Sequence, residues 1–130
     1  MCTGACTQPG RFVTVECGIG WLAWTLHAMD ESYVKHSFWV APKLPMKPSD
    51  YFRRQGWCTF SDDPMGLETR HWIGTDRLLF GNDYPHHEGS WPHTRDVVKQ
   101  TMNSLSDEER RMVLGGNAAR LYGFDLAALC

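Results

Sequence analysis

Three short segments rich in β-forming residues, each followed by a helical pattern, constrain the fold of this chain most strongly. The β-rich segments are residues 11–16, 57–60 and 76–83, and the last contains the apolar run Leu78-Leu79-Phe80, which is typical of a strand buried on both faces. Apolar residues recur at helical spacing over residues 21–36, and a Ser-Asp-Asp-Pro start signal predicts a helix over 64–73. Strand and helix in repeated alternation predict an α/β fold with parallel strands.

The rest of the chain is expected to be helical or irregular. Prolines over residues 41–48 predict an irregular connection before a short helical turn at 48–54. A helix that follows Trp91-Pro92-His93 is expected to end near residue 105, and Ser106 and Glu109 have the spacing of a capping box. Gly115 and Gly116 are expected to stop that next helix, and Asn117 to cap a final one that ends at residue 122.

Composition excludes several classes of protein. The chain has 130 residues, 42% of them hydrophobic, and thirteen basic against fifteen acidic residues give a net charge of -2. This is ordinary globular usage, without the basic face that binding to nucleic acid or to anionic membranes needs. No apolar run approaches the roughly 20 residues that span a bilayer. Five cysteines without paired spacing argue against a disulfide framework, so a cytoplasmic protein is expected.

Two of these cysteines and several tryptophans adjoin apolar segments. Cys17 and Cys58 are therefore predicted to be small buried hydrophobes. Trp21, Trp24 and Trp39 are expected to pack helices onto the sheet.

The carboxyl end of the third β-rich segment concentrates chemistry-bearing side chains. In parallel α/β folds, ligands bind at this end of the strands. The run Phe80-Gly81-Asn82-Asp83-Tyr84-Pro85-His86-His87-Glu88 places the carboxylate of Asp83 and two imidazoles there. Asp83, His86 and His87 could thus bind a divalent metal, and a carboxylate beside it could accept a proton from water. The alternative is that Asp83 caps a turn and that both histidines are surface residues.

Glu16 follows the first β-rich segment, just before the glycine turn Gly18-Ile19-Gly20. If the first and third strands flank the second, Glu16 and Asp83 face one pocket; otherwise Glu16 is a loop cap. Asp62 and Asp63, after the second segment, are expected to begin a helix rather than to bind a ligand.

Three stretches of this sequence together resemble the C-terminal half of the amidohydrolase-related metal-dependent hydrolases that are similar to aminocarboxymuconate-semialdehyde decarboxylase. The stretches are RFVTVECGIGWL (11–22), PSDYFRRQGWCTFSDD (48–63), and LFGNDYPHH (79–87) with GNAARLYGF (116–124). The resemblance implies a partial (β/α)₈ barrel formed by strands six to eight over residues 11–124, between a loose arm (1–10) and a tail (125–130).

The same resemblance implies roles for individual residues. Asp83 matches the strand-eight aspartate that binds the catalytic metal or that orients and deprotonates the attacking water. Glu16, His86 and His87 would contact substrate or support the metal ligands through hydrogen bonds. The implied cofactor is a divalent ion, with zinc favoured, and the implied reaction is hydrolysis or decarboxylation of a small carboxylated substrate.

Two departures from the family bear on activity. The family's His-x-His pair and the histidine of its fifth strand have no counterpart in this sequence, and many relatives carry histidine where Glu16 stands. A complete barrel also needs about 250 residues. The isolated chain is therefore expected to be inactive. The alternative is a non-catalytic remnant that persists as a homo-oligomer or interaction module, with some tryptophans exposed or in a dimer contact.

Overall fold

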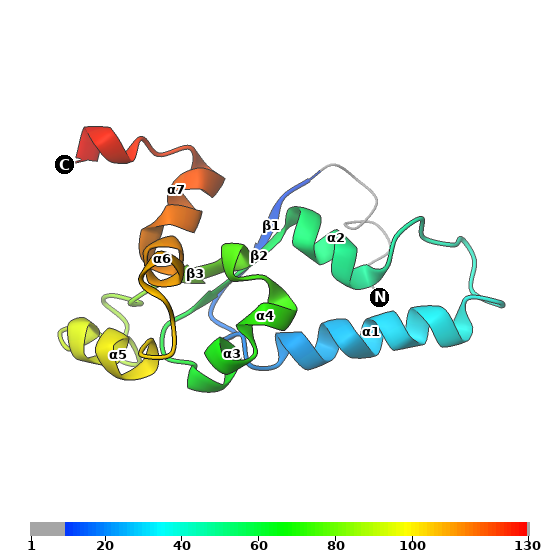
Figure 1. Ribbon diagram of the computed structural model, residues 1–130, viewed down its shortest axis with the longest axis horizontal. Coiled ribbons are helices and arrows are strands. Elements are labelled where there is room, and N and C mark those ends of the chain that lie inside the picture. Colours follow the sequence, from blue (N-terminus) through cyan, green and yellow to red (C-terminus); the bar gives the residue numbers. More distant parts are fainter. Residues whose placement is uncertain (1–9, 130) are drawn as a thin grey trace.

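A computed structural model describes residues 10–129 and has a three-stranded parallel sheet at its centre, in the order β1-β2-β3 (Figure 1). The strands are β1 (Phe12–Thr14), β2 (Gly56–Phe60) and β3 (Leu78–Phe80). The prediction of an α/β fold with parallel strands is confirmed, and β1 and β3 do flank β2. The arm expected over residues 1–10 lies, apart from Gly10, outside the described residues.

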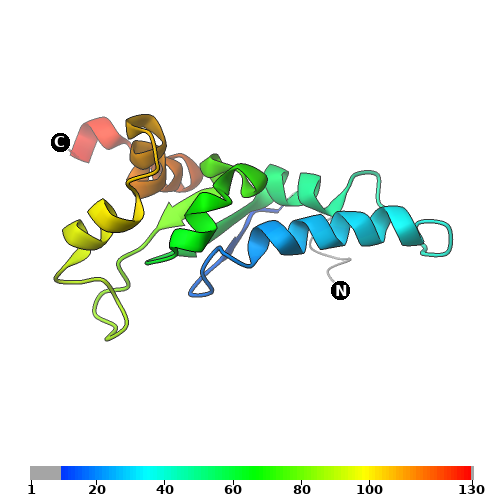
Figure 2. The same ribbon diagram turned by 60° about the horizontal axis from the view of Figure 1, so that its bottom comes forward.

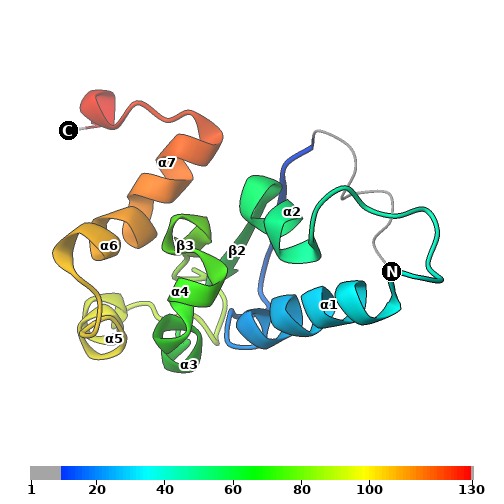
Figure 3. The same ribbon diagram turned by 45° about the vertical axis from the view of Figure 1, so that its right-hand side comes forward.

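Helical segments connect the strands and follow the last of them (Figures 1 and 3). They are α1 (Leu22–His36), α2 (Pro48–Gln55), α3 (Pro64–Glu68), α4 (Arg70–Ile73), α5 (Thr94–Thr101), α6 (Asp107–Arg111) and α7 (Asn117–Tyr122). A 3₁₀ turn (Thr75–Arg77) precedes β3, a π-helical turn (Met112–Gly116) joins α6 to α7, and the C-terminal tail holds a 3₁₀ turn (Leu126–Leu129).

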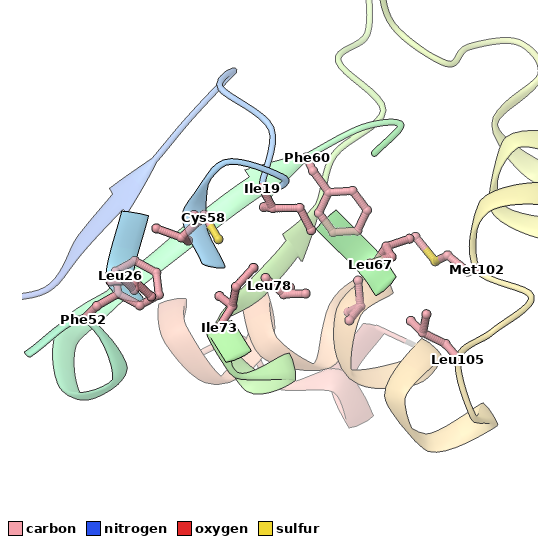
Figure 4. Packing of buried hydrophobic residues seen from close by; sticks show 12 residues of the cluster. Ile19, Leu26, Phe52, Cys58, Phe60, Leu67, Ile73, Leu78, Met102 and Leu105 are labelled. Atoms are coloured by element: carbon pink, nitrogen blue, oxygen red, sulfur yellow. The ribbon is translucent and has the colours of Figure 1, made fainter. Parts of the chain in front are cut away.

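The core lies between the sheet and the helices (Figure 4). Its centre is the middle strand, where Cys58 pairs with Thr14 on one side and Leu78 on the other. Burial raises the pKa of the Cys58 thiol to about 12, so this cysteine is the inert hydrophobe that its apolar surroundings predict. Cys17 is exposed, because it lies in the turn after β1, and its predicted burial is wrong.

Both edge strands are shorter than the sequence predicts. β1 ends at Thr14, since the backbone at Glu16 turns into the left-handed region (φ 57°). β3 begins only at Leu78, because residues 75–77 form the 3₁₀ turn, and Asp83 (φ 56°) lies beyond its end. The helix predicted over residues 64–73 is divided into α3 and α4 at Thr69.

The Gly115-Gly116 pair does not stop a helix, contrary to expectation. Gly116 has helical angles (φ -59°, ψ -40°), and the chain passes through the π-helical turn directly into α7. Asn117 is therefore not a cap. Its buried side chain donates hydrogen bonds of 2.9 Å to the carbonyl oxygens of Thr75 and Leu78, which fixes α7 to the start of β3.

Several aromatic side chains are left uncovered. Trp24 is 73% exposed and Trp39 65% exposed, so the expectation that they pack against the sheet is wrong, and Trp21 is also on the surface. The tip after α1, with Phe38 next to Trp39, projects from the body of the molecule (Figure 2). Among the described residues, no helix is both long and apolar enough to cross a membrane.

The predicted capping box at the start of α6 is present and extends into an ion pair with α4. The Ser106 hydroxyl accepts from the Glu109 amide, and Glu109 Oε2 accepts from the Ser106 amide at 2.9 Å. Glu109 Oε1 also accepts from Arg70 Nε at 2.8 Å. The hydrogen bond from Arg70, followed by that from the Ser106 amide, lowers the pKa of Glu109 to about 2.

This pKa sets the pH range in which the contact stabilises the fold. Because the pKa of Glu109 is lower in the folded state, its contribution is complete above the unfolded value near 4.5 and is lost as pH falls toward 2. Replacing Glu109 with glutamine is expected to cost about 1–2 kcal/mol at pH 7 and to flatten the fall in stability below pH 5. Urea unfolding from pH 7 to pH 3 measures both effects, with the exposed Glu108→Gln variant as the control. Equal pH slopes for Glu109→Gln and the unaltered chain would contradict the assignment.

Candidate metal-linked site at the strand ends

A cavity of about 420 Å³ lies at the carboxyl ends of the three strands. Every strand contributes to its lining: Glu16 follows β1, Thr59 belongs to β2, and Asp83 follows β3. His86 and Glu88 line it from the loop after β3, and Asp62 lines it from the loop after β2. The structure thus brings together Glu16, Asp83 and His86, three of the four residues singled out in the sequence.

Asp83 is held in place by the turn that follows it. The His86 amide donates to the Asp83 carbonyl oxygen at 2.7 Å, so the chain folds back within three residues. This turn brings His86 Nδ1 to 3.1 Å from Asp83 Oδ2. The Asp83 side chain is 34% exposed and remains accessible from the cavity. An imidazole beside a carboxylate restricts its rotation and can move a proton to or from it.

Glu16 lies two residues after the end of β1, and its amide donates to Thr59 Oγ1 at 3.3 Å. Glu16 and Asp83 are the two non-glycine residues with positive φ within residues 10–129. Such a conformation costs on the order of 1–3 kcal/mol and is commonest at functional sites, although aspartate accepts it more readily than glutamate. Both strand ends that supply the predicted carboxylates therefore have backbones that the surrounding fold must stabilise.

His87 does not line this cavity. Its side chain is 82% exposed, with Nε2 at 3.8 Å from Glu88 Oε1, and its ring lies against that of His86, with 4.6 Å between centroids. It therefore contacts two residues that line the cavity, His86 and Glu88, without lining the cavity itself.

Asp63 holds together the two turns that follow β1 and β2. As predicted it caps α3, with Oδ1 accepting from the Gly66 amide at 2.8 Å. Its other oxygen accepts from the amides of Ile19 and Gly20 at 2.6 and 2.7 Å, which ties the turn after β1 to the turn after β2. Gly66 must lack a side chain, since a Cβ there would collide with Ile19.

The electrostatic character of the cavity favours a cation. Glu16, Asp62, Asp83 and Glu88 provide four carboxylates, His86 provides one imidazole, and neither lysine nor arginine is among the lining residues. These are donors for a divalent ion of hard or borderline character. Within residues 10–129, however, no three His, Cys, Asp or Glu side chains lie close enough together to hold a metal ion. The carboxylates and the imidazole of this cavity could therefore supply some of the ligands of a divalent ion, but not all of them.

Thr59, Asp62 and Glu88 are lining residues that the sequence did not reveal as such. A signal for Thr59 existed, because it is the one polar residue of β2 and lies between the apolar Cys58 and Phe60. Asp62 could not be separated from its neighbour Asp63 by any sequence pattern, since both precede the same proline.

Comparison with known proteins places the chain in a family. The model of the amidohydrolase family matches residues 7–124, so the chain belongs to this family, as the sequence resemblance indicated. No curated protein matches the sequence.

Several solved structures share the fold of this chain. The 5-carboxyvanillate decarboxylase of Sphingomonas paucimobilis superposes with a TM-score of 0.72 at 23% identity, over 88% of this chain and 34% of that one. An amidohydrolase of Mycobacterium avium subsp. paratuberculosis K-10 gives 0.69 at 22% identity, over 85% and 28%. A dihydroxybenzoic acid decarboxylase of Polaromonas sp. JS666, solved with manganese and the inhibitor 2-nitroresorcinol, gives 0.64 at 24%, over 87% and 33%. This chain spans about a third of each.

Proposed function

We propose that this chain forms strands six to eight of a (β/α)₈ barrel, and that its strand-end cavity is one part of a metal-dependent site for decarboxylation or hydrolysis of a small carboxylated substrate. Support comes from the family match over residues 7–124 and from the fold shared with about a third of each solved relative. The parallel order β1-β2-β3 agrees with three successive strands of such a barrel.

The observation that supports this function most directly is the meeting of Glu16, Asp83 and His86 in one cavity at the carboxyl ends of the strands. Active sites of these barrels lie at that face. A residue at the carboxyl end of a barrel strand is therefore expected to act in catalysis or binding, whereas a residue at the amino end is expected to contribute to stability.

Asp83 would hold the metal ion and accept a proton, because its carboxylate faces the cavity from the end of β3. A divalent ion, when bound, supplies Lewis-acid polarisation of an oxygen atom of substrate or water. His86 orients Asp83 through the 3.1 Å contact, and Glu16 lines the cavity from the end of β1. Manganese suits the carboxylate-rich lining as well as zinc does, and manganese is the ion bound in the Polaromonas structure.

The remaining ligands would come from outside the described residues, since these contain no three-ligand cluster. The chain alone would thus hold the ion weakly and lack turnover. Its substrate would be a small molecule whose carboxylate meets the ion.

Metal retention tests this proposal. The chain is passed through gel filtration with manganese, alone and together with the two thirds of the Sphingomonas decarboxylase that it does not match, and bound metal is measured by mass spectrometry. We expect retention of metal only by the mixture, and its loss when the chain carries Asp83→Asn. Absence of metal from both preparations, or retention by the mixture with Asp83→Asn, would count against the proposal.

A further inference from the structure

The far end of α1 and the loop after it gather exposed apolar side chains. Residues 34–43, which we call the tip, include Phe38 (81% exposed), Trp39 (65%), Val34 (60%) and Val40 (46%). These four side chains lie within seven consecutive residues, at a part of the molecule that projects from its body (Figure 2). Removing apolar surface from water is favourable, and exposed apolar patches often mark sites of interaction. The tip is therefore expected to be a contact surface.

The tip is also a basic segment of an acidic chain. It contains Lys35 and Lys43 and neither Asp nor Glu, whereas the chain has a net charge of -2, so the other 120 residues carry -4. Within residues 10–129, Lys43 makes no ion pair, and Lys35 pairs with Glu31 at 3.2 Å, with both side chains at least half exposed. Such a surface pair is weak. The tip thus attracts an anionic surface that the rest of the molecule repels.

The backbone of the tip is held by hydrogen bonds of its own. The amides of Trp39 and Val40 both donate to the His36 carbonyl oxygen at 3.2 Å, and the Tyr33 hydroxyl donates to the Leu44 carbonyl oxygen at 2.6 Å. The second bond holds the returning loop against α1, beside an apolar groove of about 240 Å³. Amides that are paired in this way can leave water without the penalty that unpaired polar groups incur in lipid.

The size and shape of the tip favour a lipid surface over a folded protein as its partner. A stable protein interface takes about 20–30 residues from each side, and the tip has ten. The interface of a bilayer, in contrast, accepts a few tryptophan and phenylalanine side chains at the level of its headgroups, and anionic lipids attract the lysines beside them. A projecting segment with two aromatic residues between two lysines matches such a surface.

We propose that the tip binds peripherally to membranes that contain anionic lipids, with Phe38 and Trp39 inserted among the headgroups and Lys35 and Lys43 against the anionic groups of the lipids. The composition of the whole chain predicts no membrane binding, and the tip departs from that average. α1 extends for about 22 Å from the turn after β1, so a chain bound through the tip keeps the acidic cavity at the strand ends open to water. The inference is independent of the function proposed for that cavity, because no residue of the tip lines it.

Co-sedimentation of the 130-residue chain with lipid vesicles tests this binding. Vesicles of phosphatidylcholine with about 30% phosphatidylserine should bind the chain, and vesicles of phosphatidylcholine alone should bind it at least about tenfold less, because each lysine near an anionic surface contributes roughly fivefold. Raising the salt concentration to about 0.5 M should weaken the binding to the anionic vesicles.

Two double variants separate the contribution of charge from that of insertion. Lys35→Gln/Lys43→Gln should bind the anionic vesicles at least about tenfold more weakly than the unaltered chain. Phe38→Ser/Trp39→Ser should lose at least about as much, because serine cannot insert as an aromatic ring does. All four side chains are exposed, so both variants should keep the fold.

The matched controls lie outside the tip. Arg95→Gln/Lys99→Gln on α5 and Trp24→Ser on α1 also remove exposed cations or an exposed tryptophan, and each should change vesicle binding by less than about twofold. Equal binding of the anionic vesicles by the unaltered chain and by Phe38→Ser/Trp39→Ser would overturn the proposal, as would equal binding of the two kinds of vesicle. Failure of the unaltered chain to bind either kind would overturn it too, and would favour an acidic protein as the partner.

Quenching of tryptophan fluorescence by brominated phosphatidylcholine in the anionic vesicles locates the contact. We expect quenching in the unaltered chain and in Trp24→Ser, and its loss in Trp39→Ser. Quenching that persists in Trp39→Ser and disappears in Trp24→Ser would show that another face of the molecule enters the lipid, contrary to the proposal.

Discussion

Replacing Asp63 with alanine is expected to lower the free energy of unfolding of the chain by about 3–4 kcal/mol. The cap of α3 accounts for about 1 kcal/mol, and the loss of two hydrogen bonds from backbone amides to a charged acceptor adds the rest. The amides of Ile19 and Gly20 would also be left partly buried without an acceptor. The whole stability of a domain this size is about 5–15 kcal/mol, so the change is large.

The packing around Asp63 leaves little room for compensation. A side chain on Gly18 would come within 2.9 Å of Asp63 Oδ2, and Gly18 has a φ of 62°, which favours glycine. The turn after β1 is therefore formed around this carboxylate. Loss of the carboxylate should loosen the end of β1, and with it the position of Glu16.

Two variants give the measurement its reference points. Asp62→Ala removes the neighbouring exposed carboxylate and should change the free energy of unfolding by less than about 0.5 kcal/mol. Asp63→Asn keeps one acceptor oxygen and should fall between Asp63→Ala and the unaltered chain. Urea unfolding gives all three values, and a cost below about 1 kcal/mol for Asp63→Ala would show that the two turns are not held together by this side chain.

The three strands and their parallel direction could be predicted from the sequence, because hydrophobic pattern and turn residues agree at each strand, whereas the order β1-β2-β3 stayed a condition until the structure supplied it. Leu78-Leu79-Phe80 has the character of a buried strand and lies in one. The lengths of the edge strands could not be predicted, since a left-handed backbone at Glu16 has no signal in a segment rich in valine. Asn117 follows two glycines, a pattern that predicts a helix cap. Only its hydrogen bonds to Thr75 and Leu78 show that its side chain instead joins α7 to the start of β3.

The part of the candidate site that could be predicted from the sequence is the part whose residues lie close together in one segment. Asp83 and His86 belong to a single run of residues, and Glu16 joins them because the ends of parallel strands meet at one edge. The sequence marks Thr59 only as the one polar residue of β2, and its place in the cavity follows from how the three strands pack. His87 adjoins His86 in sequence, but the turn directs it outward.

Asp83→Asn is expected to weaken binding of manganese to the chain by about tenfold or more, because even the loss of an outer-shell partner of a metal commonly costs 10–100-fold in affinity. Asparagine adopts a left-handed backbone as readily as aspartate, so the turn to His86 should be kept. The substitution thus removes a charge and a metal ligand without removing the local structure. The control is Glu31→Gln, which removes an exposed carboxylate of α1 that does not line the acidic cavity.

Paramagnetic line broadening in ¹⁵N-labelled chain, titrated with manganese to millimolar concentration, measures this directly. We expect broadening in the three segments that contribute to the acidic cavity, residues 15–18, 59–62 and 81–88, and we expect it to persist in Glu31→Gln and to be lost in Asp83→Asn. Broadening centred on other residues, or broadening of these residues that is unchanged in Asp83→Asn, would contradict the claim that the strand ends of this chain are part of a metal site.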